Sequence, residues 1–314
     1  MDRRTFLGVG AGLGVGAALG LAATTSCATR RRTTRYQGGS SPWPLCLNSS
    51  TIRPQTLQKK IEVAAEAGYD GIEPWVGELE EFEKGGGDLK ALGKEIAGRG
   101  LFVPNVIGLW GAMPAEQDAW DKSLEASRNR MRMAAAIGSQ HVAAIPAPDR
   151  PDFDLKRGAE QYRELLRIGR DEFGITVALE FVGFLKGVHR LGQAAAIALD
   201  ANDPDACLIA DTFHLFRGDS GFDGIRHLDG AFIADFHWND VPADPPREQQ
   251  GDEHRVYPGD GILPLTGLLK DLLAIDYTGP LCLELFNREH WEQDPLVVAE
   301  TGRRKILEGI AAAV

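Results

Sequence analysis

The sequence reads TVALEF at residues 176–181, CLIAD at residues 207–211 and FIADFHW at residues 232–238. Each run is short and mostly apolar, and longer amphipathic segments separate the runs. This alternation is typical of βαβ units, in which parallel strands are covered on both faces and become almost continuously apolar. The stretch therefore predicts a parallel sheet with helices packed around it.

The same alternation runs from residue 43 to the end of the chain and gives eight strand–helix pairs. Eight pairs in 272 residues match the repeat length of a closed eight-stranded barrel. The predicted strands are residues 44–47, 71–73, 103–107, 141–145, 176–181, 207–210, 232–238 and 280–285. The predicted helices are residues 54–67, 89–99, 119–137, 155–173, 191–201, 225–228, 265–274 and 295–312.

A doubly wound sheet is the alternative architecture. It usually has a glycine-rich phosphate turn after its first strand, whereas residues 47–51 read LNSST. The glycines at 85–87 fall in a loop. We therefore expect an α/β protein with a single (β/α)8 TIM barrel over residues 43–314 and no second domain.

The first 28 residues form a separate unit. Arg3 and Arg4 precede TFL, then a Gly/Ala/Leu run, then ATTSCA at 23–28. This pattern predicts a twin-arginine export signal and a periplasmic or cell-envelope protein. A membrane anchor is the alternative, but the apolar run at 6–23 is short and rich in glycine. Ordinary cleavage of the signal is favoured over acylation of Cys27. Apart from the signal, a lipid on Cys27 would be the only expected contact with the membrane.

Residues 29–42 are predicted to be a flexible linker, because they combine arginines with GGSSP at 38–42. The chain carries a formal net charge of −11. Six of its basic residues and one acidic residue precede residue 43, so the barrel carries a charge near −16. Such a surface repels phosphate backbones, and we expect no nucleic-acid partner.

The remaining cysteines, Cys46, Cys207 and Cys282, lie in apolar runs without Cys-x-x-Cys spacing. They are predicted to be packed core thiols. A disulfide between Cys46 and Cys282 is the alternative if their strands are neighbours, since an exported protein meets an oxidising compartment.

Four consecutive predicted strands carry a charged or titratable residue near the carboxyl end: Glu180, Asp211, His237 and Glu284. A charge is unusual in a strand that is covered on both faces. Active sites of these barrels lie at the carboxyl ends of the strands, where the four side chains would converge. Taken singly, each could be a strand-end charge that faces solvent or one that is satisfied by an arginine.

Three carboxylates gathered away from water repel one another unless a cation compensates them. Oxygen-rich ligation with one imidazole and no thiolate favours Mn²⁺ or Mg²⁺, with Co²⁺ or Zn²⁺ less favoured. The sequence therefore predicts one divalent metal on these four residues. Asp235 shares a face with His237 and is expected either to orient that imidazole or to pack against an arginine.

Several segments resemble the xylose-isomerase-like sugar isomerase/epimerase superfamily, and inosose isomerases and ketose 3-epimerases in particular. These are DTFH at 211–214, HWND at 237–240, HRVYPGDG at 254–261, LCLN at 45–48 and AGYDGIE at 67–73. The resemblance covers the whole chain after the linker. It implies a TIM barrel, a metal site and a small-molecule carbohydrate or cyclitol as the substrate.

The resemblance also implies roles for individual residues. Glu180 and Glu284 would act as acid and base on the carbon next to a carbonyl, through an enediolate. His214 and Arg255 would bind substrate oxygens. Independently of the resemblance, Asn48, Glu73, Trp75 and Trp110 follow the first three strands on the same rim, and they are expected to bind hydroxyls or stack on a ring, with packing within the loops as the alternative.

The expected function is metal-dependent isomerisation or epimerisation of an unphosphorylated sugar, keto-sugar or inosose. The main alternative is a metal-dependent 3-keto-glycoside lyase or hydrolase that uses the same site, and a third is a non-catalytic sugar-binding protein. The related abasic-site endonucleases need further histidines that this chain lacks on its second and third strands. Homo-oligomerisation is left open.

Overall fold

The computed structural model describes residues 36–146 and 150–314. Its eight strands are all parallel and run around the barrel in the order β2-β1-β8-β7-β6-β5-β4-β3. The strands are β1 Leu45–Asn48, β2 Gly71–Glu73, β3 Asn105–Trp110, β4 His141–Ile145, β5 Thr176–Glu180, β6 Cys207–Asp211, β7 Ile233–Trp238 and β8 Leu281–Leu283. The predicted TIM barrel is confirmed.

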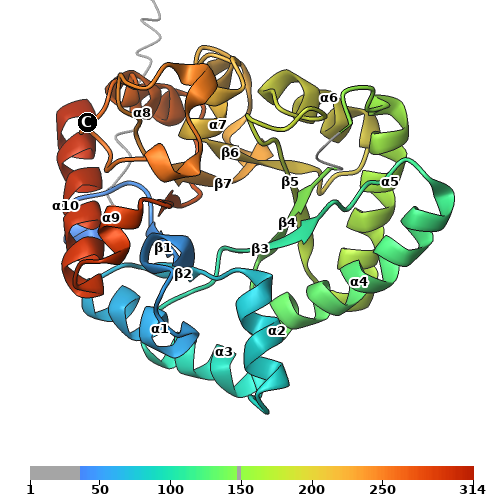
Figure 1. Cartoon of the computed structure of the whole chain (residues 1–314), viewed down its shortest axis with the longest axis horizontal. Coiled ribbons are helices and arrows are strands. Elements are labelled where there is room, and N and C mark those ends of the chain that lie inside the picture. Colours follow the sequence, from blue (N-terminus) through green and yellow to red (C-terminus); the bar gives the residue numbers. More distant parts are fainter. Residues whose placement is uncertain (1–35, 147–149) are drawn as a thin grey trace, which may run out of the picture. The chain divides into compact units, whose positions relative to one another are not determined.

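The barrel is nearly closed between β2 and β3. Only isolated bridges join this pair, Gly71 with Phe102 and Trp75 with Ile107. Figure 1 shows the helices on the outside of the ring of strands. Because all strands run in one direction, their carboxyl ends and the loops that follow them share one rim.

The helices are α1 Leu57–Glu66, α2 Val76–Lys84, α3 Leu89–Gly98, α4 Gln117–Ala136, α5 Leu155–Ile168, α6 Leu191–Ala201, α7 Thr212–Arg217, α8 Leu265–Ala274, α9 Arg288–Trp291 and α10 Pro295–Ala313. Two predicted helices, 191–201 and 265–274, have the predicted bounds. The predicted helix at 225–228 is a single 3-10 turn, Ile225–His227. No helix was predicted where α2, α7 and α9 lie.

The last part of the predicted linker, residues 36–42, contacts the barrel. Within residues 36–42, Gln37 Nε2 donates to the Gly68 carbonyl at 3.1 Å and to Asp70 Oδ2 at 2.6 Å, and Arg303 Nε donates to Gln37 Oε1 at 2.6 Å. Ser41 is fully buried. These polar contacts attach the last seven linker residues to the barrel. The predicted signal, Cys27 and the first part of the linker lie outside the described residues.

The barrel interior holds both an apolar cluster and buried polar groups. Side chains of β3 to β6, including Ile107, Ala143, Ala178 and Ile209, form a separate apolar cluster. Buried asparagine, glutamate, aspartate or histidine side chains lie on β1, β2, β3, β5, β6 and β7. A buried polar group must find a partner, so these groups indicate a functional site. Among the described residues, no helix is both long and apolar enough to cross a membrane.

The three described cysteines are free and buried, as predicted for core thiols. Cys46 and Cys282 are register partners on the neighbouring strands β1 and β8, yet no disulfide joins them. Cys282 Sγ instead donates to Glu73 Oε2 at 3.2 Å. The alternative of a Cys46–Cys282 disulfide is therefore wrong for this structure.

Candidate metal centre

Four side chains meet at one point of the rim. Glu180 ends β5, Asp211 ends β6, His237 lies in β7 and Glu284 directly follows β8. All four are at least 95% buried. His237 Nδ1 lies 3.3 Å from Glu180 Oε1, 3.6 Å from Asp211 Oδ2 and 3.2 Å from Glu284 Oε2. The structure thus brings together the four residues that the sequence singled out.

The donor set fits a divalent cation. His237 Nδ1 is buried and makes no hydrogen bond within the part of the chain that the structure describes, although it faces three carboxylates. Ligand atoms of Asp211, His237 and Glu284 lie within 4.8 Å of one another, as do those of Glu180, Asp211 and His214. One imidazole nitrogen with several carboxylate oxygens suits Mn²⁺, Mg²⁺ or Zn²⁺.

Arg255 bridges two of these carboxylates. Its Nη1 lies 2.8 Å from Asp211 Oδ2 and 2.7 Å from Glu284 Oε2. A further carboxylate, Asp252, accepts from Arg255 Nε at 3.0 Å and from Nη2 at 2.5 Å. The guanidinium therefore contacts three carboxylates, and Glu180 faces His237 instead.

Burial and neighbouring charges shift the protonation of the site. Burial raises the pKa of Glu180 to about 7. Burial also acts to raise the pKa of Asp211, but Arg255 and His214 outweigh it and the pKa lies well below its usual range. Burial acts to lower the pKa of His237, but Glu284 and Glu73 outweigh it and raise that pKa well above the ordinary value. A metal that binds here must therefore displace protons.

Glu73 lies inside the barrel against His237. It is fully buried, and its Oε1 accepts from His237 Nε2 at 3.1 Å and from Asn105 Nδ2 at 2.7 Å. Its Oε2 accepts from Asn48 Nδ2 at 2.6 Å. A carboxylate on one ring nitrogen fixes the imidazole and leaves the other nitrogen free to bind metal. This placement differs from the substrate-contacting rim position that the sequence suggested for Glu73 and Asn48.

Asp235 lies beside Glu73 and Cys282, with potential ligand atoms within 4.8 Å of theirs. Its Oδ1 accepts from the Phe236 backbone N–H at 2.7 Å, and Oδ2 has no partner among the described residues. Burial and then the charge of Glu73 raise the pKa of Asp235 well above its usual range. The raised pKa favours the protonated form of Asp235 beside Glu73. Glu73, and not Asp235, forms the ion pair with His237 Nε2.

His214 and Arg255 lie buried beside the metal centre. His214 is on α7, and its Nε2 is 3.4 Å from Arg255 Nη2. Burial lowers the pKa of His214 to about 4, so the ring is neutral near pH 7. Asp211 Oδ1 accepts from the Phe213 N–H at 2.6 Å and so begins α7. A metal ligand therefore also positions the helix that carries His214.

The rim residues differ in exposure. Trp110, at the end of β3, is 48% exposed. Asn48 is fully buried, and its Oδ1 accepts from Trp75 Nε1 at 3.1 Å and from the Ser50 N–H at 2.8 Å. Three residues near the centre were not found from the sequence. Asn105 donates a hydrogen bond to Glu73, and Asp252 accepts one from Arg255. The Phe286 ring lies 5.1 Å from the Arg255 guanidinium.

Comparison with known proteins identifies the class. The family described as Xylose isomerase-like TIM barrel matches residues 61–308, and the chain belongs to this family. The chain is 24% identical to an inosose isomerase of Bacillus licheniformis, over 85% of this chain and 98% of that protein. It is 26% identical to a 3-dehydroshikimate dehydratase of Pseudomonas aeruginosa, over 74% of this chain and 36% of that protein.

A solved structure has the same fold. The crystal structure of the IOLI protein with a binding zinc atom superposes with a TM-score of 0.80. Sequence identity is 24%, and the match covers 86% of this chain and 99% of that one. The chain is therefore an enzyme of the xylose-isomerase-like superfamily, and its acidic cluster suits a divalent metal.

Proposed function

We propose that this protein is a divalent-metal-dependent isomerase or epimerase of an unphosphorylated sugar, keto-sugar or inosose. The observation that carries the proposal is the position of His237 Nδ1, unpaired among the described residues and within 3.2–3.6 Å of three carboxylates. The metal is Mn²⁺ in this proposal, because oxygen ligands predominate. The zinc atom bound in the IOLI structure supports a divalent metal in this proposal.

The residues of the chain divide the chemistry between them. Bound at these four side chains, a divalent metal supplies Lewis acidity that stabilises negative charge on the substrate's carbonyl oxygen. Glu284, whose Oε2 accepts from Arg255 Nη1, removes the proton from the carbon next to the carbonyl. Glu180 returns a proton, and its pKa of about 7 suits proton exchange near neutrality. Return to the opposite face of the same carbon gives epimerisation, and return to the neighbouring carbon gives isomerisation.

A second candidate is the cleavage of a 3-keto-glycoside. The proton abstraction is the same, but a β-substituent then leaves with the electron pair of its bond to carbon and the product gains a double bond. The similarity to a 3-dehydroshikimate dehydratase supports this alternative, because that name also denotes an elimination. The predicted export supports it as well, since an exported enzyme meets glycosides before they are broken down.

Deuterium uptake separates the candidates. Metal-loaded protein is incubated in D2O with inososes, ketohexoses and 3-keto-glycosides, and the products are followed by NMR and mass spectrometry. Exchange at carbon without cleavage supports the isomerase or epimerase, and release of an aglycone supports the lyase. Glu284→Gln is the control and should show neither. Binding without exchange in the wild type would refute both catalytic proposals.

Export is a separate part of the proposal. The Arg3-Arg4 pair and the following apolar run support it. Fractionation of cells that produce the full chain, compared with an Arg3→Lys/Arg4→Lys variant, tests it. The wild type should reach the periplasm and the variant should stay in the cytoplasm. Equal distribution of the two would contradict the export proposal.

A further inference from the structure

Phe184 is an exposed aromatic side chain on the rim that carries the metal centre. It lies in the loop after β5 and is 38% exposed. The other aromatic side chains that the structure describes are buried or half-buried, apart from Trp110 at the end of β3. Loops on this rim carry the binding groups of barrels of this kind, so a ring exposed there is placed to meet a ligand.

The loop that carries Phe184 is held by backbone contacts. The Val182 N–H donates to the Val188 carbonyl at 3.1 Å. Gly183 approaches α7 so closely that a Cβ at this position would lie 2.8 Å from the His214 carbonyl oxygen. The ring is therefore presented by a fixed loop against α7, and a ligand that packs on the ring would lose little free energy in ordering the loop.

Phe184 is one ring away from a residue of the metal centre. Its ring packs edge to face on the His214 ring, with 5.6 Å between the two centroids. His214 Nε2 lies 3.9 Å from Asp211 Oδ2 and 3.4 Å from Arg255 Nη2. The polar centre and the exposed phenyl ring are thus neighbours on one rim.

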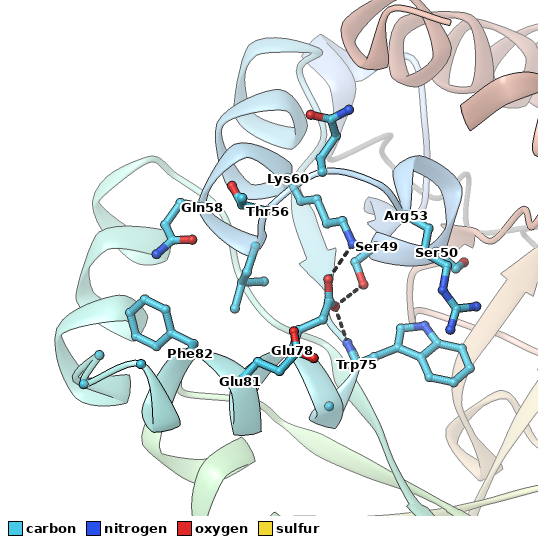
Figure 2. A pocket seen from close by; sticks show the side chains of 16 residues that line it. Ser49, Ser50, Arg53, Thr56, Gln58, Lys60, Trp75, Glu78, Glu81 and Phe82 are labelled. Carbon is cyan, nitrogen blue, oxygen red and sulfur yellow. Dashed lines mark hydrogen bonds and ion pairs between the residues drawn. The ribbon is translucent and has the colours of Figure 1, made fainter. Parts of the chain in front are cut away.

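Trp75, which follows β2, is a second aromatic side chain on this rim, and groups of the chain itself already surround it. Its ring packs edge to face on Phe286 at 5.8 Å between centroids, and its Nε1 donates to Asn48 Oδ1 at 3.1 Å. Figure 2 shows Arg53 beside it, and the Arg53 guanidinium lies 5.8 Å from the centre of the Trp75 ring. Trp75 is half-buried as a result, and Phe184 is the more open of the two rings.

The metal centre and the phenyl ring suit different parts of a carbohydrate. The centre offers carboxylate, imidazole and guanidinium groups, which bind oxygens directly or through a metal. A phenyl ring offers an apolar face, which packs on C–H groups. In a closed ring such as scyllo-inositol the hydroxyls point outward along the edge and the C–H bonds stand on the faces. One phenyl ring can therefore contact several C–H groups together. An open chain has no such face and loses more rotational freedom when it is ordered.

We infer that Phe184 is a specificity-determining residue, which packs on the C–H face of a ring-closed substrate at the metal centre. It favours inososes and ring-form keto-sugars over open-chain ketoses. The inference rests on the proposed function and narrows its substrate class by the shape of the carbon skeleton. Phe184 takes no part in proton transfer, so its replacement should raise KM and leave kcat nearly unchanged.

A matched pair of non-reacting polyols tests the inference. Sorbitol and scyllo-inositol have the same numbers of carbons and hydroxyls, but only the inositol is a ring. The Mn²⁺-loaded full chain is titrated with each polyol by calorimetry. The wild type should bind scyllo-inositol about three- to tenfold more tightly than sorbitol, as expected for one aromatic stacking contact. A wild type without this preference overturns the inference.

Variants of Phe184 separate stacking from apolar bulk. Phe184→Leu removes the flat ring and should weaken scyllo-inositol about three- to tenfold, with sorbitol affinity unchanged. Phe184→Trp keeps a flat ring and should retain the preference. Leu199→Ala, a change of an exposed apolar side chain on α6, is the control and should alter neither affinity. A preference that survives in Phe184→Leu, including equal weakening of both polyols, overturns the inference.

Failure of the proposed function gives a different result. The two polyols carry no carbonyl and cannot react, so their titration does not depend on proton transfer. Loss of deuterium exchange with the ring preference intact would refute the proposed function alone. Deuterium exchange without the ring preference would refute the role of Phe184 alone.

Discussion

Glu73→Gln should weaken metal binding although Glu73 contacts no metal. The carboxylate faces four donors: Asn105 Nδ2 and His237 Nε2 on Oε1, and Asn48 Nδ2 and Cys282 Sγ on Oε2. An amide has a single oxygen, so its NH2 group opposes two donors whichever way it is turned. The conflict is relieved if His237 moves its proton from Nε2 to Nδ1. Nδ1 is then no longer available to a metal.

The magnitude follows from the loss of one carboxylate partner of a ligating histidine. Such losses cost about 10–100-fold in metal affinity, or roughly 1.4–2.7 kcal/mol. Metal-free Glu73→Gln and wild-type protein are titrated with Mn²⁺ by calorimetry, and circular dichroism checks the fold. Glu292→Gln removes the same charge from an exposed side chain and is the control. The reasoning is refuted if Glu73→Gln binds Mn²⁺ within twofold of the wild type.

Three further predictions concern the centre itself. Glu284→Gln should keep the fold and lose about 10²–10⁴-fold in turnover, because general acid–base groups contribute that much; wild-type turnover would remove Glu284 from the proton transfer. Metal affinity should fall as the pH drops below about 7, because Glu180 and His237 then hold protons that the metal must displace. Calorimetry in buffers of different ionisation enthalpy should show that metal binding releases protons. A metal affinity that is independent of pH would contradict this prediction. Arg255→Ala should destabilise the metal-free protein by about 3–5 kcal/mol in urea unfolding, because Asp211 and Glu284 lose their buried partner. Mn²⁺ should restore part of the lost stability. An unchanged unfolding midpoint would contradict the bridging role of Arg255.

The sequence predicted most of the barrel because each strand is an apolar run with a helical segment after it. It failed for α2, which is nine residues long, includes four glutamates and has only three large apolar residues, Val76, Leu79 and Phe82. Glu78 starts this helix by accepting from the Trp75 N–H, an interaction that no periodic pattern reveals. It also failed for α7, because Asp211 was read only as a metal ligand and not as the cap of a helix.

The four central residues could be found from the sequence because a charge at the end of a buried strand is conspicuous. The position of Glu73 inside the barrel could not be found from the sequence. β2 is three residues long, and the sequence does not show whether its last residue reaches the rim or stays in the barrel. Asp252 begins a short 3-10 turn and Phe286 lies in a loop, so only the folded chain shows that they contact Arg255.

Anomalous X-ray diffraction from crystals of the full chain grown with Mn²⁺ tests the metal centre most directly. One strong peak should appear, within about 2.0–2.3 Å of His237 Nδ1 and of oxygens from Glu180, Asp211 and Glu284, and His237 Nε2 should still face Glu73. A peak at another cluster, or no peak in crystals with Arg255 still bridging Asp211 and Glu284, would contradict the account.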